Sequence, residues 1–252
     1  VRRWSVSGHS KWAGIKHKKA VVDARKGQTF TKVANEVTVA ARESGGDPTS
    51  NFRLRLAVQK AREVNMPADN IERAIKRGTG ELQGAAIEEI RYEGYGPSGV
   101  AILVDVLTDN RNRTVAAIRN LFTRSGGSLG ESNSVGWMFN RIGLIRVESK
   151  GQDPEELALR AIELGADDVQ VEDGVTEVYV APERLEDLRR AIDAANLEVE
   201  TAEVTMQPST TVEVDAKTAP AVVRLLEALD EHDDVKEVHC NAVLPNDVLA
   251  EV

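Results

Sequence analysis

The sequence predicts an α+β protein of three domains, in which a helical N-terminal domain is followed by two ferredoxin-like α/β domains, one inserted in the other. Three observations support this fold class. Apolar residues recur at helical spacing before residue 80 and at a period of two beyond it. A stretch past residue 140 has the complete strand and helix order βαββαβ. The charge also changes sign along the chain, from a basic N-terminal third to an acidic C-terminal part.

The basic third predicts three helices. Apolar positions at helical spacing cover residues 30–41, and the breaker Gly45-Gly46-Asp47-Pro48 ends that helix. A second helix is predicted through residues 54–61, and a third follows Pro67 and ends at Gly78. We therefore expect a basic helical domain over residues 1–80, including an N-terminal arm.

The rest of the chain predicts two α/β domains. A hairpin and a helix come first, at residues 87–93, 100–107 and 111–124. The βαββαβ run follows, at residues 142–148, 154–164, 168–172, 175–181, 182–195 and 197–206. A last strand, helix and strand are predicted at residues 210–216, 217–229 and 235–243. The predicted domains are therefore 131–206, inserted, and a discontinuous domain made of 81–130 plus 207–252.

Composition excludes several classes of protein. No apolar run approaches the ~18 residues that span a bilayer, and residues 1–6 show no apolar stretch of the kind found in secretory signals. Cys240 is the single cysteine, which excludes an internal disulfide and any multi-cysteine zinc or iron–sulfur site. We expect a cytoplasmic protein with no membrane partner, no cofactor and no metal.

The net charge of −9 conceals a strong asymmetry. Residues 1–80 carry 17 Lys and Arg against 7 Asp and Glu, whereas residues 148–252 carry 8 against 27. Such segregation suggests that the basic part meets a polyanion and the acidic part does not. The alternative is that the basic domain docks on the acidic third of its own chain.

No group of residues resembles an active site. His239 and Cys240 adjoin in a predicted strand, so their side chains point to opposite faces and do not form a nucleophile–base pair. Glu231-His232-Asp233-Asp234 is best explained as a solvated turn. Gly78-Thr79-Gly80 follows a helix instead of a strand, which does not fit a nucleotide motif. We expect no enzymatic activity and no small-molecule substrate.

The basic arm is the stronger candidate for function. It interleaves cations with an indole and two imidazoles, a mixture that suits phosphates and unstacked bases. The alternative is a solvated terminus whose Trp12 packs on its own domain. The candidate nucleic-acid-binding residues of the arm and the helical domain are His9, Lys11, Trp12, Lys16, His17, Lys18, Lys19, Arg25, Lys26, Lys32, Arg73, Lys76 and Arg77.

Two further places are candidates. Arg111 and Arg113 fall in the first turn of a predicted helix, where the macrodipole disfavours cations, so an external anion would explain them. The alternative is pairing with local carboxylates such as Asp105 or Glu131. Tyr95 lies in a glycine-rich turn and is a possible stacking surface, although the turn itself is explained by hairpin structure.

Several short motifs resemble the YebC/PmpR family, which includes the mitochondrial translational activator of cytochrome oxidase subunit one. They occur in order, as Ser-Gly-His-Ser-Lys-Trp at 7–12, Ile-Lys-His-Lys-Lys at 15–19, Gly-Gly-Asp-Pro at 45–48, Tyr-Glu-Gly-Tyr-Gly-Pro at 92–97, Asp-Asn-Arg-Asn-Arg-Thr at 109–114 and Gly-Gly-Ser-Leu-Gly at 126–130. Val6 stands where family members usually carry Met, and residues 1–6 are assigned no role.

The resemblance implies a three-domain, cytoplasmic, non-enzymatic regulator of gene expression. Such proteins are commonly labelled DNA-binding transcriptional regulators, and members are also described as ribosome-associated factors that help elongation through proline runs. DNA reading usually needs a helix that presents its side chains to the major groove, and no helix-turn-helix pair with an obvious recognition face is predicted in residues 27–78. An arm rich in Lys, His and Trp suits irregular RNA better. We therefore expect a monomer that binds ribosomal RNA, with DNA as the alternative partner.

Overall fold

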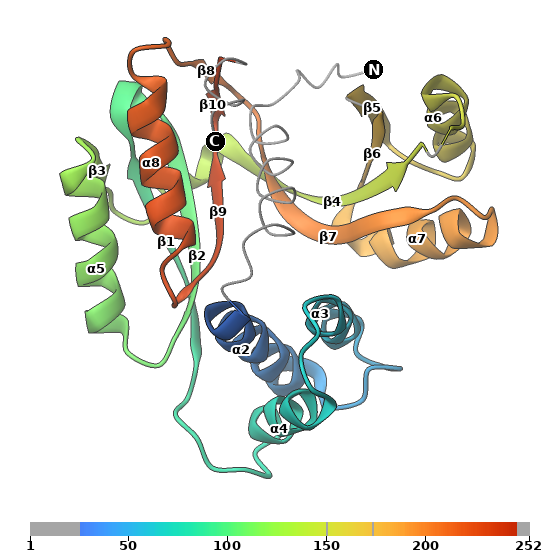
Figure 1. Cartoon of the computed structure of the whole chain (residues 1–252), viewed down its shortest axis with the longest axis horizontal. Coiled ribbons are helices and arrows are strands. Elements are labelled where there is room, and N and C mark those ends of the chain that lie inside the picture. The colour runs from blue at the N-terminus through green and yellow to red at the C-terminus, as the bar shows by residue number, and fades with distance from the viewer. Residues whose placement is uncertain (1–25, 150, 173, 246–252) are drawn as a thin grey trace. The chain divides into compact units, whose positions relative to one another are not determined.

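The computed structural model describes residues 26–149, 151–172 and 174–245, and these form two compact units (Figure 1). One unit contains the described residues up to Met138 together with those from Pro208 onward, and the other is Phe139–Gln207. No helix within these described residues has the length and apolar character needed to cross a membrane.

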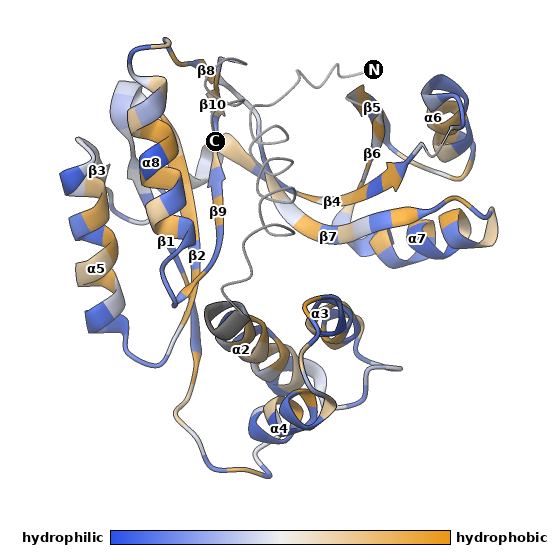
Figure 2. Ribbon diagram, viewed as in Figure 1, coloured by the Kyte–Doolittle hydropathy of each residue, from blue (hydrophilic) through white to orange (hydrophobic). Residues whose placement is uncertain are grey.

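The first unit begins with three helices, which are α2 (Lys26–Ser44), α3 (Phe52–Glu63) and α4 (Ala68–Gly78). They pack around a shared apolar core that includes Val37, Leu54 and Ile71, and Figure 2 shows hydrophilic residues on their other sides. All three helices were predicted. Gly78 has a packing reason beyond ending its helix, because a Cβ there would lie 2.3 Å from the Thr38 carbonyl oxygen.

The turn between α2 and α3 is organised by Asn51. Its side-chain oxygen accepts a hydrogen bond from the Leu54 amide at 3.0 Å, which caps α3. Its side-chain amide donates to the carbonyls of Ala40 and Gly45, both at 2.8 Å. Asn51 is buried, and these three bonds satisfy its polar atoms while they fix the angle between the two helices.

A four-stranded antiparallel sheet follows in the same unit, with strand order β3-β1-β2-β9. Its strands are β1 (Glu88–Tyr95), β2 (Ala101–Thr108), β3 (Ser128–Leu129) and β9 (Val235–Cys240). Helices α5 (Arg111–Arg124) and α8 (Ala219–Asp230) lie side by side along it (Figure 1). Phe122 and Leu226 of these helices pack with Val104 of β2 in one continuous core. The hairpin and both helices were predicted.

The end of this sheet differs from the prediction. The strands expected over residues 210–216 and 235–243 are shorter, and β8 (Val212–Glu213) pairs in parallel with β10 (Ala242–Val243) in a separate two-stranded sheet. The cause is Asn241, whose side-chain oxygen accepts the Ala101 amide at 2.8 Å. The side chain replaces a backbone acceptor, so the ladder between β2 and β9 stops there.

The second unit has the ferredoxin-like order β5-β6-β4-β7. Its elements are β4 (Phe139–Glu148), α6 (Pro154–Glu163), β5 (Asp168–Glu172), β6 (Val175–Val180), a 3₁₀ turn (Pro182–Arg184), α7 (Leu185–Ala194) and β7 (Val199–Pro208). Ile145 and Val178 of the sheet are buried, as are Leu157 of α6 and Ile192 of α7. The predicted βαββαβ order is therefore confirmed, with a 3₁₀ turn at the start of the second helix.

These units predict how fragments of the chain behave. Residues 139–207 expressed alone should fold and melt cooperatively, because they contain all four strands of the sheet and both helices of the second unit. Residues 81–130 should not fold alone, since β9 and α8, which complete the sheet and its core, lie beyond residue 207. Circular dichroism melting curves of the two fragments provide the measurement. A cooperative transition for 81–130 would contradict this account.

Candidate nucleic-acid interface

Helix α4 presents a row of cations. Arg73, Lys76 and Arg77 occupy positions three and four residues apart, so they are neighbours on one side of the helix. Lys76 pairs with Glu72 at 2.6 Å, and the guanidinium of Arg73 donates to the side chain of Asn70. Arg77 is exposed, and within the described residues no hydrogen bond or ion pair engages its guanidinium. This row is the basic surface that the structure describes most fully.

Other cations of the helical part make structural contacts. Arg53 pairs with Glu43 and, at 2.8 Å, with Glu89 of β1, while Arg42 donates to the Ile87 carbonyl at 2.6 Å. These bonds attach the helices to the sheet.

Lys32, a predicted nucleic-acid-binding residue, makes a contact within the chain. Its ammonium group donates to the Asp230 carbonyl at the end of α8. This half-buried contact ties α2 to the α/β part, so the structure gives Lys32 a structural function.

The arm of the predicted interface lies outside the described residues. This applies to His9, Lys11, Trp12, Lys16, His17, Lys18, Lys19 and Arg25. Lys26 is the first residue of α2. The arm's contribution therefore stays a prediction from the sequence.

The start of α5 is closed by groups of the chain itself. Asn110 caps the helix, its side-chain oxygen accepting the Arg113 amide at 3.1 Å. The Asp234 carboxylate lies at the same helix end, where it accepts a hydrogen bond from the Thr114 hydroxyl at 2.6 Å. Arg113 binds this carboxylate at 2.9 Å and Asp109 at 3.0 Å. The Asp234 carboxylate thus lies at the N-terminal end of α5, where the sequence suggested that an external anion would bind.

The structure therefore favours pairing as the explanation of Arg113, although the partners are not the two that were named. Asp109 and Asp234 hold it, in place of Asp105 or Glu131. Asp105 instead binds Arg91 at 2.6 Å. Burial alone would raise the pKa of Asp105, but the hydrogen bonds from Arg91 and the nearby His239 ring outweigh burial and hold the pKa well below its usual range.

The neighbouring candidates are exposed to different degrees. Arg111 is exposed beside the hydroxyl of Tyr92, whose pKa is raised by burial despite the opposing effect of Arg111. Tyr95, the possible stacking residue, is half-buried and its hydroxyl donates to the Ser134 carbonyl at 3.1 Å. Only part of its ring is therefore available.

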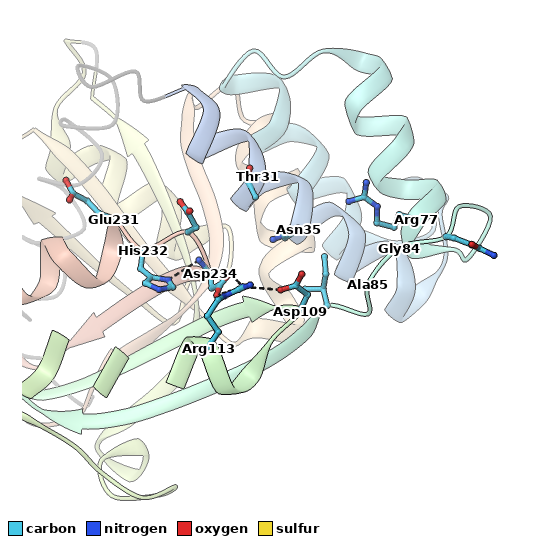
Figure 3. Close-up of a pocket in the computed structure, with 13 residues that line it drawn as sticks. Thr31, Asn35, Arg77, Gly84, Ala85, Asp109, Arg113, Glu231, His232 and Asp234 are labelled. Atoms are coloured by element: carbon cyan, nitrogen blue, oxygen red, sulfur yellow. Dashed lines mark hydrogen bonds and ion pairs between the residues drawn. The ribbon is translucent and has the colours of Figure 1, made fainter. Parts of the chain in front are cut away.

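A cleft of about 890 Å³ lies between α2 and the start of α5 (Figure 3). Arg77 and Arg113 line it, but so do four acidic residues, Asp109, Glu231, Asp233 and Asp234. His232 also lines it, and its ring Nδ1 accepts the Asp234 amide at 3.1 Å. This excess of carboxylates disfavours a phosphate inside the cleft. Among the described residues no set of His, Cys, Asp and Glu is arranged to hold a metal ion.

The two residues tested for nucleophilic chemistry point apart. Cys240 is buried in the core beneath α5 and α8, whereas His239 lies 3.5 Å from Asp105 on the other face of the sheet. Burial raises the pKa of the Cys240 thiol to about 11, which keeps it protonated near neutral pH. This geometry does not provide a thiolate nucleophile.

Comparison with known proteins identifies the family. Residues 10–81 match the model of the TACO1/YebC protein N-terminal domain, and residues 87–242 match that of the TACO1/YebC second and third domain. The chain belongs to the TACO1/YebC family. The recognition of this family from the short motifs is thereby confirmed, and so is the fold class of a helical region followed by α/β domains.

Relatives within the TACO1/YebC family are similar over nearly their whole length. A probable transcriptional regulatory protein of Pelotomaculum thermopropionicum is 53% identical, with 94% of this chain and 98% of that protein covered. One of Moorella thermoacetica is 54% identical, covering 95% and 96%. The crystal structure of a conserved hypothetical protein from Aquifex aeolicus superposes with a TM-score of 0.85 at 47% identity, over 93% of this chain and 97% of that one.

The contacts of Asp234 and the exposure of Trp137 were not predicted from the sequence. Asp234 was placed in a solvated turn, and no local signal links it to a helix that begins more than 100 residues earlier. Trp137 is 68% exposed. A tryptophan after the glycine- and serine-rich segment 126–136 was a usable signal for an exposed aromatic.

The pairing of Arg113 predicts a loss of stability on charge reversal. Arg113→Glu places a third carboxylate beside Asp109 and Asp234, so the melting temperature should fall more than for the neutral Arg113→Met. The pKa of Asp234 is lowered because hydrogen bonds from Thr114 and Arg113 outweigh its burial. The ionised Asp234 carboxylate therefore contributes fully to the stability of the fold above its ordinary pKa of 3.8, and this contribution is lost as the pH falls below that value. An unchanged or higher melting temperature for Arg113→Glu at pH 7 would contradict the pairing.

The environment of Cys240 predicts a protected thiol. At pH 8 the native chain should react with a thiol-specific reagent far more slowly than the same chain in denaturant, because the folded thiol has a pKa of about 11 and is buried. Absorbance of the released chromophore measures both rates. Equal rates would show that this core opens readily.

Proposed function

We propose that this TACO1/YebC chain is a non-catalytic, nucleic-acid-binding regulator of gene expression that contacts its polyanion through the basic N-terminal third. In its specific form, the proposal is a ribosome-associated translation factor that binds ribosomal RNA and aids elongation through difficult, proline-rich sequences. The observation that carries the proposal is the concentration of 17 cations in residues 1–80, part of which forms the exposed row on α4.

The cations of the row on α4 can release their present side-chain partners and bind phosphates instead. Arg73 donates to Asn70 and to the Asp69 carbonyl of its own helix, and Lys76 pairs with Glu72 and lies near Glu81, and such contacts at the surface contribute little to stability. A phosphate that displaced Glu72 from Lys76 would also release counterions, which favours binding. Arg77 needs no displacement. The row therefore offers three cations at small energetic cost.

RNA is favoured over DNA as the target by the distribution of the helical cations. A helix that reads the major groove presents a free set of side chains to the bases. On α3, Arg53 and Lys60 are bound by Glu43, Glu89 and Glu36, and Arg55 donates to the carbonyls of Pro48 and Thr49. The cations of the helical part that remain are those of α4, which can contact the phosphate backbone of a nucleic acid. Together with the Lys-, His- and Trp-containing arm, they suit folded RNA.

The second candidate function is DNA-binding transcriptional regulation. It is favoured by the name of the relatives from Pelotomaculum and Moorella, which are probable transcriptional regulatory proteins. Both functions use the same basic surface, and neither requires the acidic residues beyond 148 to contact the nucleic acid. We propose that the chain acts as a cytoplasmic monomer in either case.

The proposed surface predicts a specific dependence on salt. Affinity for a ribosomal RNA fragment should fall with salt concentration, with a logarithmic slope of about −0.7 to −0.9 per phosphate contact. Replacing Lys16, Lys18 and Lys19 together with Ala should flatten the slope by about two to three units, and Arg73→Ala with Arg77→Ala by about one to two. Titrations followed by fluorescence anisotropy at several salt concentrations measure this.

The matched control is Arg190→Ala. Arg190 pairs with Glu186 four residues away, as Lys76 pairs with Glu72, but it lies on α7 in the second unit. Its removal should leave the slope unchanged. Equal slopes for the wild type and both basic variants would overturn the proposed surface. Crosslinking in cells, followed by identification of the bound nucleic acid, separates ribosomal RNA from promoter DNA.

A further inference from the structure

The segment that follows β3 is held by one buried carboxylate. Glu93 of β1 is 7% exposed, and its two carboxylate oxygens accept hydrogen bonds from three backbone amides. The donors are Asn133 and Val135, each at 2.8 Å, and Gly136 at 2.6 Å. Three amides that converge on one buried carboxylate fix the backbone of residues 133–136.

Two aromatic side chains meet at this segment. The Ser134 carbonyl accepts the hydroxyl of Tyr95 at 3.1 Å and the indole N–H of Trp137 at 3.2 Å. A shared acceptor holds the Tyr95 hydroxyl and the Trp137 indole N–H beside the same oxygen. Trp137 is further restrained because the next residue, Met138, accepts the amide and the hydroxyl of Ser209 at 2.7 and 2.8 Å. Trp137 is therefore exposed but anchored on both sides.

The environment of Trp137 indicates the kind of partner that it fits. Its N–H is already bonded within the chain, so the part of the side chain left for a partner is the aromatic face. The exposed residues just before it, Glu131, Ser132 and Asn133, are polar, and in the described part of this unit the other large exposed apolar residue is Leu82. A protein interface would need an apolar core around the indole. A base needs only the stacking face.

We infer that Trp137, flanked by Tyr95, is a stacking platform for an unpaired base of the bound nucleic acid. This inference rests on the proposed function and extends it to a contact remote in sequence from the basic arm. The bases of a duplex are stacked on each other, so an indole reaches a base face in single-stranded segments, loops and bulges. The anchoring by Glu93 and Ser134 lowers the entropy lost when the indole stacks.

The test compares two variants of Trp137 with a matched control on two probes. The probes are a single-stranded oligoribonucleotide and a duplex of the same sequence. Trp137→Ala should weaken single-strand binding about 5-fold or more and leave duplex binding unchanged, whereas Trp137→Phe should restore most of the affinity. The control is Leu159→Ala, which removes a side chain that is 64% exposed but has no aromatic face, and it should change neither affinity.

Salt dependence provides a second readout. Stacking releases no counterions, so Trp137→Ala should lower the affinity without changing the salt slope, unlike the lysine variants. Trp137 fluorescence, obtained as the difference between wild type and Trp137→Phe, should be quenched by the single strand.

The outcomes separate the inference from the function on which it rests. Unchanged single-strand affinity for Trp137→Ala would overturn the stacking platform alone, and so would an equal loss of affinity for both probes. A wild-type chain that binds neither probe at low salt would overturn the proposed function itself. Circular dichroism of each variant confirms that the chain remains folded.

Discussion

Burial of the whole of β2 is the constraint on which the first unit depends. All eight residues from Ala101 to Thr108 are buried, and Figure 2 shows the strand as largely hydrophobic. Such a strand needs a hydrogen-bonding partner on each edge, and one of the two, β9, comes from residues 235–240. The chain must therefore return to this sheet after the residues of the second unit. The hydrogen bonds from Ser209 to the Met138 carbonyl hold together the two chain segments that flank the second unit.

The same return brings Asp234 to the start of α5. A carboxylate at this helix end compensates the helix dipole, receives the Thr114 hydroxyl and holds Arg113. The tertiary structure thus removes the electrostatic conflict that two arginines in a first helical turn would otherwise create. It also changes the candidate interface, because the charge at this helix end is largely balanced within the chain while the row on α4 remains at the surface.

Sequence reasoning succeeded where the signal was local. The hairpin β1–β2, the helices of both units and the βαββαβ order follow from hydrophobic period and turn residues, which act over a few positions. It failed where a residue acts across the chain. Asn241 ends β9 by bonding to Ala101, Lys32 reaches Asp230, and Asp234 reaches Thr114, each over more than 100 residues. Nothing in the neighbouring sequence marks these partners, and the two-residue strand β3 is too short for a periodic signal.

The way Glu93 holds the following segment has a consequence for sequence variation. The carboxylate binds backbone amides, which every residue except proline possesses, so the conformation of residues 133–136 depends little on which side chains they carry. Two positions are exceptions. A Cβ at Gly136 would lie 3.1 Å from a Glu93 carboxylate oxygen, and Asn133 has a φ of 67°, a left-handed conformation that asparagine and glycine adopt more readily than other residues. The exposed positions 131 and 132 can therefore be changed, by natural divergence or by design, to alter what is recognised next to Trp137 without altering the position of Trp137.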